Sequence, residues 1–324
     1  VRNVETWIPS SLVDLDRNAG GIRVLTGTGQ SGRTFQFTGG LEGELQRDRR
    51  RNFDNERGEQ GALSLDQDED VTAFGAFVQA RWLPSDRGSV EASVRYDLAR
   101  FSATDHFVAD DNVDGSGSRT MDAISPALTG FLELGSGVGL FGGISTFFET
   151  PTTSELANQP SGAGGFNPAL DPQTGTTFEG GIRASMSGGP RAEVTAFHTR
   201  VRSELVPFEV PETAGRVYFR NAGRSRYQGL ELSATVPLWR EFRLRSSYTY
   251  VDASFREYSV DQEDLSGNRI PGVSRHSLDG LISWNGDPFG EDHPVFTEIR
   301  IRRNGSVFVD DGNSDEAPAY TLLD

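Results

Sequence analysis

The side chains with the clearest binding chemistry gather between residues 207 and 226. This segment is expected to be a surface loop, and it contains Phe208, Arg216, Tyr218, Phe219, Arg220, Arg224 and Arg226. Guanidinium groups beside aromatic faces suit an anionic, planar ligand, because Arg donates paired hydrogen bonds and stacks on rings. The alternative is that these arginines form ion pairs with neighbouring acidic residues.

A second candidate site is the acidic run over residues 110–115. Its pattern resembles the start of a calcium-binding loop, with oxygen ligands from Asp110, Asn112 and Asp114. The twelfth position of such a loop supplies a bidentate Glu, but Met121 stands there. The segment is therefore expected to be an exposed acidic loop, and no metal site is assigned.

Other chemistry is excluded by composition. The 324 residues contain no Cys, and all 31 basic residues are Arg, so thiol and Lys-dependent chemistry is absent. The four His residues are scattered, and no G-x-S-x-G nucleophile motif occurs. We expect neither enzymatic activity nor a cofactor. The formal charge of −16 argues against binding to nucleic acid.

The elements that must position these residues are strands. Apolar and polar residues alternate with a period of two over 35–46, 90–98, 230–236 and 242–250. This alternation predicts strands with one apolar and one polar face. Helical periodicity is nearly absent, and no run approaches the roughly 20 apolar residues of a membrane-spanning helix.

Short and long connections alternate between the expected strands. Short turns are expected near 27–32, 84–88, 135–137, 188–190, 237–241 and 285–294, and long polar loops at 49–69, 105–121, 151–176, 207–226, 257–272 and 310–317. Strands of this length do not suit a sandwich or a propeller, and a soluble barrel of this size could not fill its interior. We therefore predict an all-β, transmembrane, antiparallel up-and-down β-barrel of about 14 strands.

In such a barrel the polar strand faces line a wet lumen and the apolar faces contact lipid. Aromatic residues near strand ends would form interfacial girdles, with Trp82, Phe147, Phe148, Tyr248, Tyr250 and Trp284 as candidates. The loop arginines could then also pair with phosphates of lipopolysaccharide. The arginine run over 47–51 is expected to be a solvated rim.

Three motifs occur in a consistent order along the chain. The first runs from Asn167-Pro168 through Pro172 to Glu179. The second runs from Asn221 and Gly223 to Gly229 and Glu231, and the third from the Tyr248-Thr249-Tyr250 strand to Pro271 and His276. Together they resemble the barrel of TonB-dependent outer-membrane receptors. Ser274 stands where the family pattern has Pro.

The resemblance implies a bacterial outer-membrane location and energy-coupled uptake of a scarce nutrient, most commonly a ferric siderophore such as a catecholate or citrate complex. The energy would come from the TonB–ExbB–ExbD system through an N-terminal segment. The family barrel has 22 strands around an N-terminal plug, so residues 1–324 are expected to be a partial barrel without plug or final strands. The alternatives are a passive porin or adhesin, or a receptor for cobalamin, haem or glycans.

Overall fold

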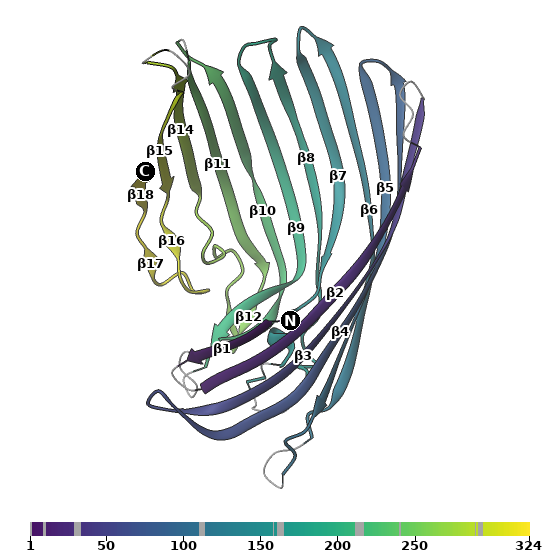
Figure 1. Cartoon of the computed structure of the whole chain (residues 1–324), viewed down its shortest axis with the longest axis vertical. Helices are drawn as coiled ribbons and strands as arrows, with labels where there is room; N and C mark the ends of the chain where they lie inside the picture. Colours follow the sequence, from purple (N-terminus) through teal and green to yellow (C-terminus); the bar gives the residue numbers. More distant parts are fainter. Residues whose placement is uncertain are drawn as a thin grey trace.

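The protein folds as one curved antiparallel sheet (Figure 1). The structure is a computed structural model that describes residues 2–8, 11–28, 34–109, 114–157, 159–160, 165–210, 217–239, 241–288, 290 and 294–324. Fourteen strands follow one another in chain order, each hydrogen-bonded to the next. The predicted all-β class and strand number are confirmed. The first and last strands do not pair with each other, so the sheet is an open, strongly curved wall.

The strands of the sheet have the following bounds: β1 (Arg2–Ile8), β2 (Ser11–Gly27), β3 (Phe35–Glu56), β4 (Glu59–Ser85), β5 (Gly88–Asp105), β6 (Gly117–Gly135), β7 (Val138–Glu149), β8 (Gln173–Ser185), β9 (Arg191–Glu209), β10 (Val217–Pro237), β11 (Phe242–Glu257), β14 (His276–Gly286), β15 (Val295–Asn304) and β18 (Tyr320–Leu323). The loops carry α1 (Thr153–Ala157) and two small hairpins: β12 (Ser259–Val260) with β13 (Glu263–Asp264), and β16 (Val307–Phe308) with β17 (Glu316–Ala317).

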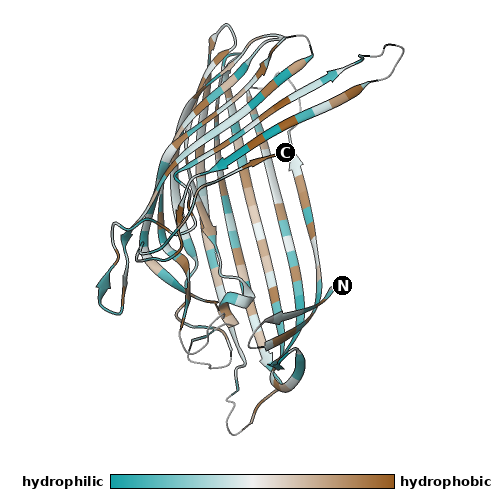
Figure 2. Cartoon of the chain, turned by 90° about the vertical axis from the view of Figure 1, so that its left-hand side faces the viewer, coloured by the Kyte–Doolittle hydropathy of each residue, from teal (hydrophilic) through white to brown (hydrophobic). Residues whose placement is uncertain are grey.

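Hydrophobic and hydrophilic residues alternate along the strands (Figure 2), and this alternation places them on opposite faces of the sheet. The outer face is apolar and solvent-accessible in the isolated chain, with Ile124 68% and Leu128 49% exposed. The inner face carries charged residues such as Glu42 and Asp97. An exposed apolar band opposite a charged inner face is the arrangement of a barrel that contacts lipid outside and water inside.

In the part of the chain that the structure describes, no helix has the length and apolarity needed to cross a membrane.

The predicted long loop at 49–69 is wrong. Strands β3 and β4 continue through this segment and meet at a two-residue turn, where the Gly58 amide donates a 2.7 Å hydrogen bond to the Asn55 side chain. The charged residues of this segment, which had suggested a loop, lie opposite each other on the two strands. Arg49 forms ion pairs of 2.7 Å with Asp66 and 3.1 Å with Asp68, so the arginine run belongs to a cross-strand ionic ladder.

Most of the other connections follow the predicted alternation, although only residues 9–10 separate β1 from β2 at the rim opposite the β2–β3 turn. Short turns join β2 to β3, β4 to β5, β6 to β7, β8 to β9, β10 to β11 and β14 to β15, all at one rim. The opposite rim, called the long-loop rim below, carries α1 and both small hairpins. The predicted 207–226 loop is too long at its C-terminal end, because β10 begins at Val217.

The two faces of β10 allow a direct test of which side contacts lipid. Leu232 is on the outer face and Ser233 on the inner face. Leu232→Arg is expected to destabilise the folded barrel by about 2–4 kcal/mol if it lies near the bilayer midplane, because a charge would face hydrocarbon. Ser233→Arg, its neighbour, should change stability little. Urea unfolding of the full-length protein in lipid vesicles measures both, and equal losses would contradict the assignment of faces.

Candidate functional site

The loop between β7 and β8 at the long-loop rim, residues 150–172, packs onto the barrel wall through a small apolar core. Leu156 of α1 and Leu170 are almost completely buried, and they pack with Phe101 of β5 and Met121 of β6. The Arg119 guanidinium of β6 donates hydrogen bonds to the carbonyl oxygens of Leu170 and, at 2.7 Å, of Asn167. This loop is therefore a packed element.

Two motif residues fix this loop. The Asn221 side chain of β10 accepts a 2.8 Å hydrogen bond from the Asp171 amide and donates one of 2.8 Å to the Asp171 carbonyl. Asn167 uses its side-chain oxygen to accept a 3.0 Å bond from the Ala169 amide. Both asparagines thus have structural roles, and Pro168 and Pro172 lie in the same loop.

The other motif residues are spread along the strands and loops. Gly229 of β10 sits so close to the Tyr250 carbonyl of β11 that any Cβ there would overlap it. Glu179 of β8 and Glu231 of β10 lie at inner-face positions of the sheet. Gly223 is in β10 and Pro271 in the loop after β13.

A second apolar core packs the loop that follows β11 against β9 and β10. Phe255 and Tyr258 are buried and pack with Val206, Ala222 and Leu265. Phe255 and Tyr258 rings lie 4.6 Å apart at their centroids. This core holds the β12–β13 hairpin against β9 and β10.

Polar contacts then tie the loop that follows β11 to the loop that follows β15. The Tyr258 hydroxyl donates a 2.7 Å hydrogen bond to the Asp311 carboxylate, and burial raises the pKa of Tyr258, so the phenol remains protonated and donates. The Asn313 side chain accepts a 2.7 Å bond from the Arg269 amide and returns one of 2.8 Å to the Arg269 carbonyl. We call this pair of joined loops, residues 258–275 and 305–319, the loop clamp.

The loop clamp and the upper parts of β9 and β10 enclose a cavity of about 590 Å³, which we call the rim cavity. Arg220 is its one described cation, and its guanidinium carbon lies 4.0 Å from the Phe208 ring centroid. The Phe208 and Tyr218 centroids are 5.9 Å apart. The structure therefore brings together three of the predicted ligand-binding residues.

The Arg220 guanidinium also lies 6.0 Å from the Tyr258 ring centroid, and one of its donors, the buried Nε, has no hydrogen-bond partner among the described residues. No described carboxylate forms an ion pair with this guanidinium. The acidic lining residues are Glu204, Glu209, Glu263, Asp310 and Asp311. Five carboxylates against one guanidinium give the described lining an excess of negative charge.

Two predicted site residues lie elsewhere. Arg224 and Arg226 are strand residues of β10, where they form ion pairs of 3.1 Å with Glu257 and 2.7 Å with Asp252. For these two arginines the alternative prediction, pairing with neighbouring acids, is confirmed. The prediction that these two residues lie in a loop is wrong. Strand β10 continues beyond its apolar part with polar side chains on its outer face, and such polar residues resemble a loop in the sequence. Arg216 lies outside the described residues.

The calcium prediction stays untested, because Asp110 and Asn112 also lie outside the described residues. Asp114 accepts a 2.8 Å hydrogen bond from the Ser116 amide, as in a tight turn. Within the described ranges no group of three or more His, Asp or Glu side chains could hold a metal ion.

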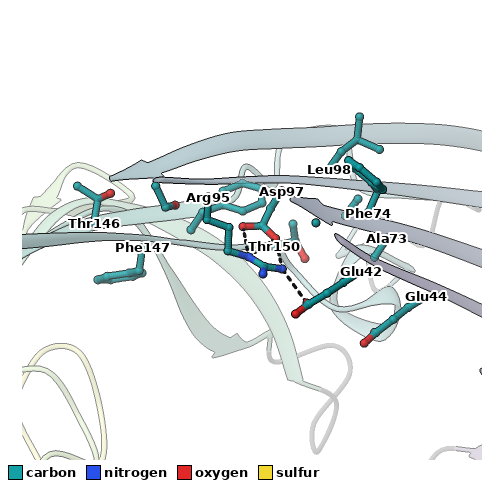
Figure 3. A pocket seen from close by; sticks show the side chains of 14 residues that line it. Glu42, Glu44, Ala73, Phe74, Arg95, Asp97, Leu98, Thr146, Phe147 and Thr150 are labelled. Carbon is teal, nitrogen blue, oxygen red and sulfur yellow. Dashed lines mark hydrogen bonds and ion pairs between the residues drawn. The ribbon is translucent and has the colours of Figure 1, made fainter. Parts of the chain in front are cut away.

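A further cavity on the inner wall was not anticipated from the sequence (Figure 3). Arg95 of β5 donates to Asp97 at 2.8 Å and reaches across β4 to Glu42 of β3 at 3.0 Å, and Glu42 also pairs with Arg23 at 2.8 Å. A Cβ at Gly75 would overlap the Arg95 guanidinium, so a larger residue there would require this guanidinium to move. Only the strand register reveals this network, and the sequence does not give the register.

Comparisons with known proteins agree with this fold. Residues 5–324 match the family model described as TonB dependent receptor-like, beta-barrel. The chain is 27% identical over 215 residues to the metal-pseudopaline receptor CntO of Pseudomonas aeruginosa, covering 65% of this chain and 28% of that protein. It is 25% identical over 202 residues to the iron-regulated outer membrane virulence protein of Vibrio cholerae, covering 56% and 29%.

Solved structures give the same result for the fold. The ferric yersiniabactin uptake receptor FyuA from Yersinia pestis superposes with a TM-score of 0.76 at 17% identity, covering 99% of this chain and 48% of that chain. The ferric citrate transporter FecA superposes with a TM-score of 0.75 at 16% identity, with the same coverage. The chain thus spans about half the length of these receptors.

The hydrogen bond between Tyr258 and Asp311 should stabilise the loop clamp. Tyr258→Phe is expected to weaken the clamp by on the order of 1.5 kcal/mol, because a bond to a carboxylate is lost. Hydrogen exchange of amides in 258–275 and 305–319 should speed up, while β4 amides stay unchanged as the internal control. Unchanged exchange in the clamp would contradict the role of this bond.

The turn over residues 310–315 should respond to acid. Backbone amides of Ser314 and Asp315 donate to the Asp310 carboxylate and lower its pKa below the ordinary 3.8. A lowered carboxylate pKa adds stability that is full above the ordinary value and is lost as the pH falls through the lowered value.

The amides of residues 186–190 serve as the control, because they report the intrinsic effect of pH on exchange. Relative to this control, the Ser314 and Asp315 amides should therefore exchange faster as the pH falls from about 5 to about 2. Asp310→Asn should remove this extra acceleration. If wild type and Asp310→Asn responded identically to acid, the carboxylate would not control the turn.

Proposed function

Because this chain belongs to the TonB-dependent receptor-like β-barrel family, we propose that it serves energy-coupled uptake of a metal chelate of the ferric-siderophore class. The family is one of transport receptors, and the bacterial outer membrane is its location. TonB, with ExbB and ExbD, is the energy source in this proposal.

The names of the relatives support the substrate class. They include receptors for metal-pseudopaline and for ferrioxamine B, and the structural neighbours include receptors for ferric yersiniabactin and ferric citrate. The observation in this chain that carries the proposal is the rim cavity, where the Arg220 guanidinium, the Phe208 ring and several carboxylates converge at the long-loop rim.

The charge of the cavity refines the class of chelate. A lining with five carboxylates and one guanidinium favours a ligand with a neutral or cationic periphery, since like charges repel a strongly anionic one. The sequence had suggested an anionic ligand, on the assumption that Arg224 and Arg226 lie beside Arg220. We therefore propose Phe208 and Arg220 as ligand contacts for a chelate of low negative charge, with Tyr218 buried beside Phe208 as its support.

Ferrioxamine B, which carries a free ammonium group, and anionic ferric citrate are suitable opposite probes. The full-length protein in detergent should bind the ferrioxamine more tightly than the citrate complex by titration calorimetry. Arg220→Ala should weaken ferrioxamine binding about tenfold, because a charge-assisted hydrogen bond and a stacking contact are lost.

Arg224→Ala is the matched control. It removes the same charge from the same strand but outside the rim cavity, so chelate binding should stay within twofold of wild type. Equal losses in both variants, or tighter binding of ferric citrate, would contradict the proposed site.

A further inference from the structure

The outer face of β9 and β10 changes abruptly from apolar to cationic. Outward residues of β9 run from Val194 and Ala196 to Arg200 and Arg202, and those of β10 run from Leu232 and Leu230 to Arg226 and Arg224. Outward positions recur every two residues, or about 6.7 Å along a strand. The change therefore falls at the edge of the lipid-facing band that points toward the long-loop rim.

The arginines oppose each other across the two strands. Arg200 is the register partner of Arg226, and Arg202 is the partner of Arg224. Like charges directly opposite each other destabilise a sheet unless an anion lies between or beside them. Arg256, at the end of β11, lines the same surface, and we call these five residues the outer arginine cluster.

The described residues supply fewer carboxylate partners than this cluster has arginines. Glu257 pairs with Arg224, and Asp252 pairs with Arg226 but also lies 3.6 Å from a sixth arginine, Arg275. Among the residues that the structure describes, none forms an ion pair with Arg200, Arg202 or Arg256. The cluster thus has capacity for an external anion.

The surface is also hollowed and partly apolar. A cavity of about 820 Å³ contains the outer arginine cluster together with Ile124 of β6 and Phe178 of β8, both of which belong to the exposed apolar band. A free anion would use only the arginines. A lipid headgroup uses both parts, because its phosphate meets the guanidinium groups while its acyl chains follow the apolar band.

We propose that the outer arginine cluster binds the phosphates of an outer-leaflet phosphorylated glycolipid of the lipid A type. Long loops of outer-membrane barrels face the outside, so this edge of the apolar band lies at the outer headgroup layer. Several guanidinium groups within one cavity suit a lipid with more than one phosphate. This inference goes beyond the proposed uptake function, because it depends only on the membrane orientation of the barrel.

The test is native mass spectrometry of the full-length protein from mixed micelles with lipid A. Wild type is expected to retain lipid A, and the variant Arg200→Gln, Arg202→Gln, Arg224→Gln is expected to retain at least tenfold less. Replacing the same three residues with Lys should restore most of the retention, because the positive charge returns. Dephosphorylated lipid A should be retained as weakly by wild type as lipid A is by the Gln variant.

The control variant is Arg81→Gln, Arg243→Gln, Arg245→Gln, which removes three charges from inner-face positions. It should retain lipid A like wild type. Heat-modifiable migration in gels verifies that every variant is folded. Equal retention by the outer and inner variants, equal retention of dephosphorylated lipid A, or displacement by millimolar inorganic phosphate or by equimolar phosphatidylglycerol would overturn the proposal.

Discussion

The main constraint on this structure is that a backbone in hydrocarbon has no water to satisfy its amide and carbonyl groups. The antiparallel ladder from β1 to β18 meets that demand, with each strand bonded to the next. Once the ladder is fixed, every second side chain faces lipid and the others face the lumen. The apolar band, the charged inner wall and the outer arginine cluster are all consequences of this period of two.

The constraint ends at the edge of the membrane, and the packing changes there. Along the wall, side chains contact lipid or water and form little conventional core. At the long-loop rim the chain instead builds two compact apolar clusters, one around Leu156 and Phe101 and one around Phe255 and Tyr258. Folded loops with their own cores can present Arg220 and its aromatic neighbours in a fixed arrangement, which free loops could not do.

Much of the fold could be predicted from the sequence, because alternation and turn spacing are local signals. The strand number and the all-β class were predicted in this way. The ends of the strands were not predicted correctly. The charged residues in 49–69 and 217–226 are typical of loops, but cross-strand partners hold them in the ladder. The candidate site was only partly predictable. Phe208, Tyr218 and Arg220 meet, whereas Arg224 lies on the outer face, and contacts such as Arg95 with Glu42 depend on a register that one sequence does not encode.

The β3–β4 hairpin has a physical consequence beyond shape. Strand β4 has 27 residues, whereas about 10 suffice to cross a bilayer, so a large part of the hairpin stands in water. This part has a two-residue turn and an ionic ladder of Arg49, Arg51 and their acidic partners. Ions screen such exposed pairs over about 10 Å at 0.1 M salt. The contribution of these ion pairs to the rigidity of the hairpin therefore falls as the salt concentration of the surrounding water rises, while the backbone ladder of the same segment is not affected.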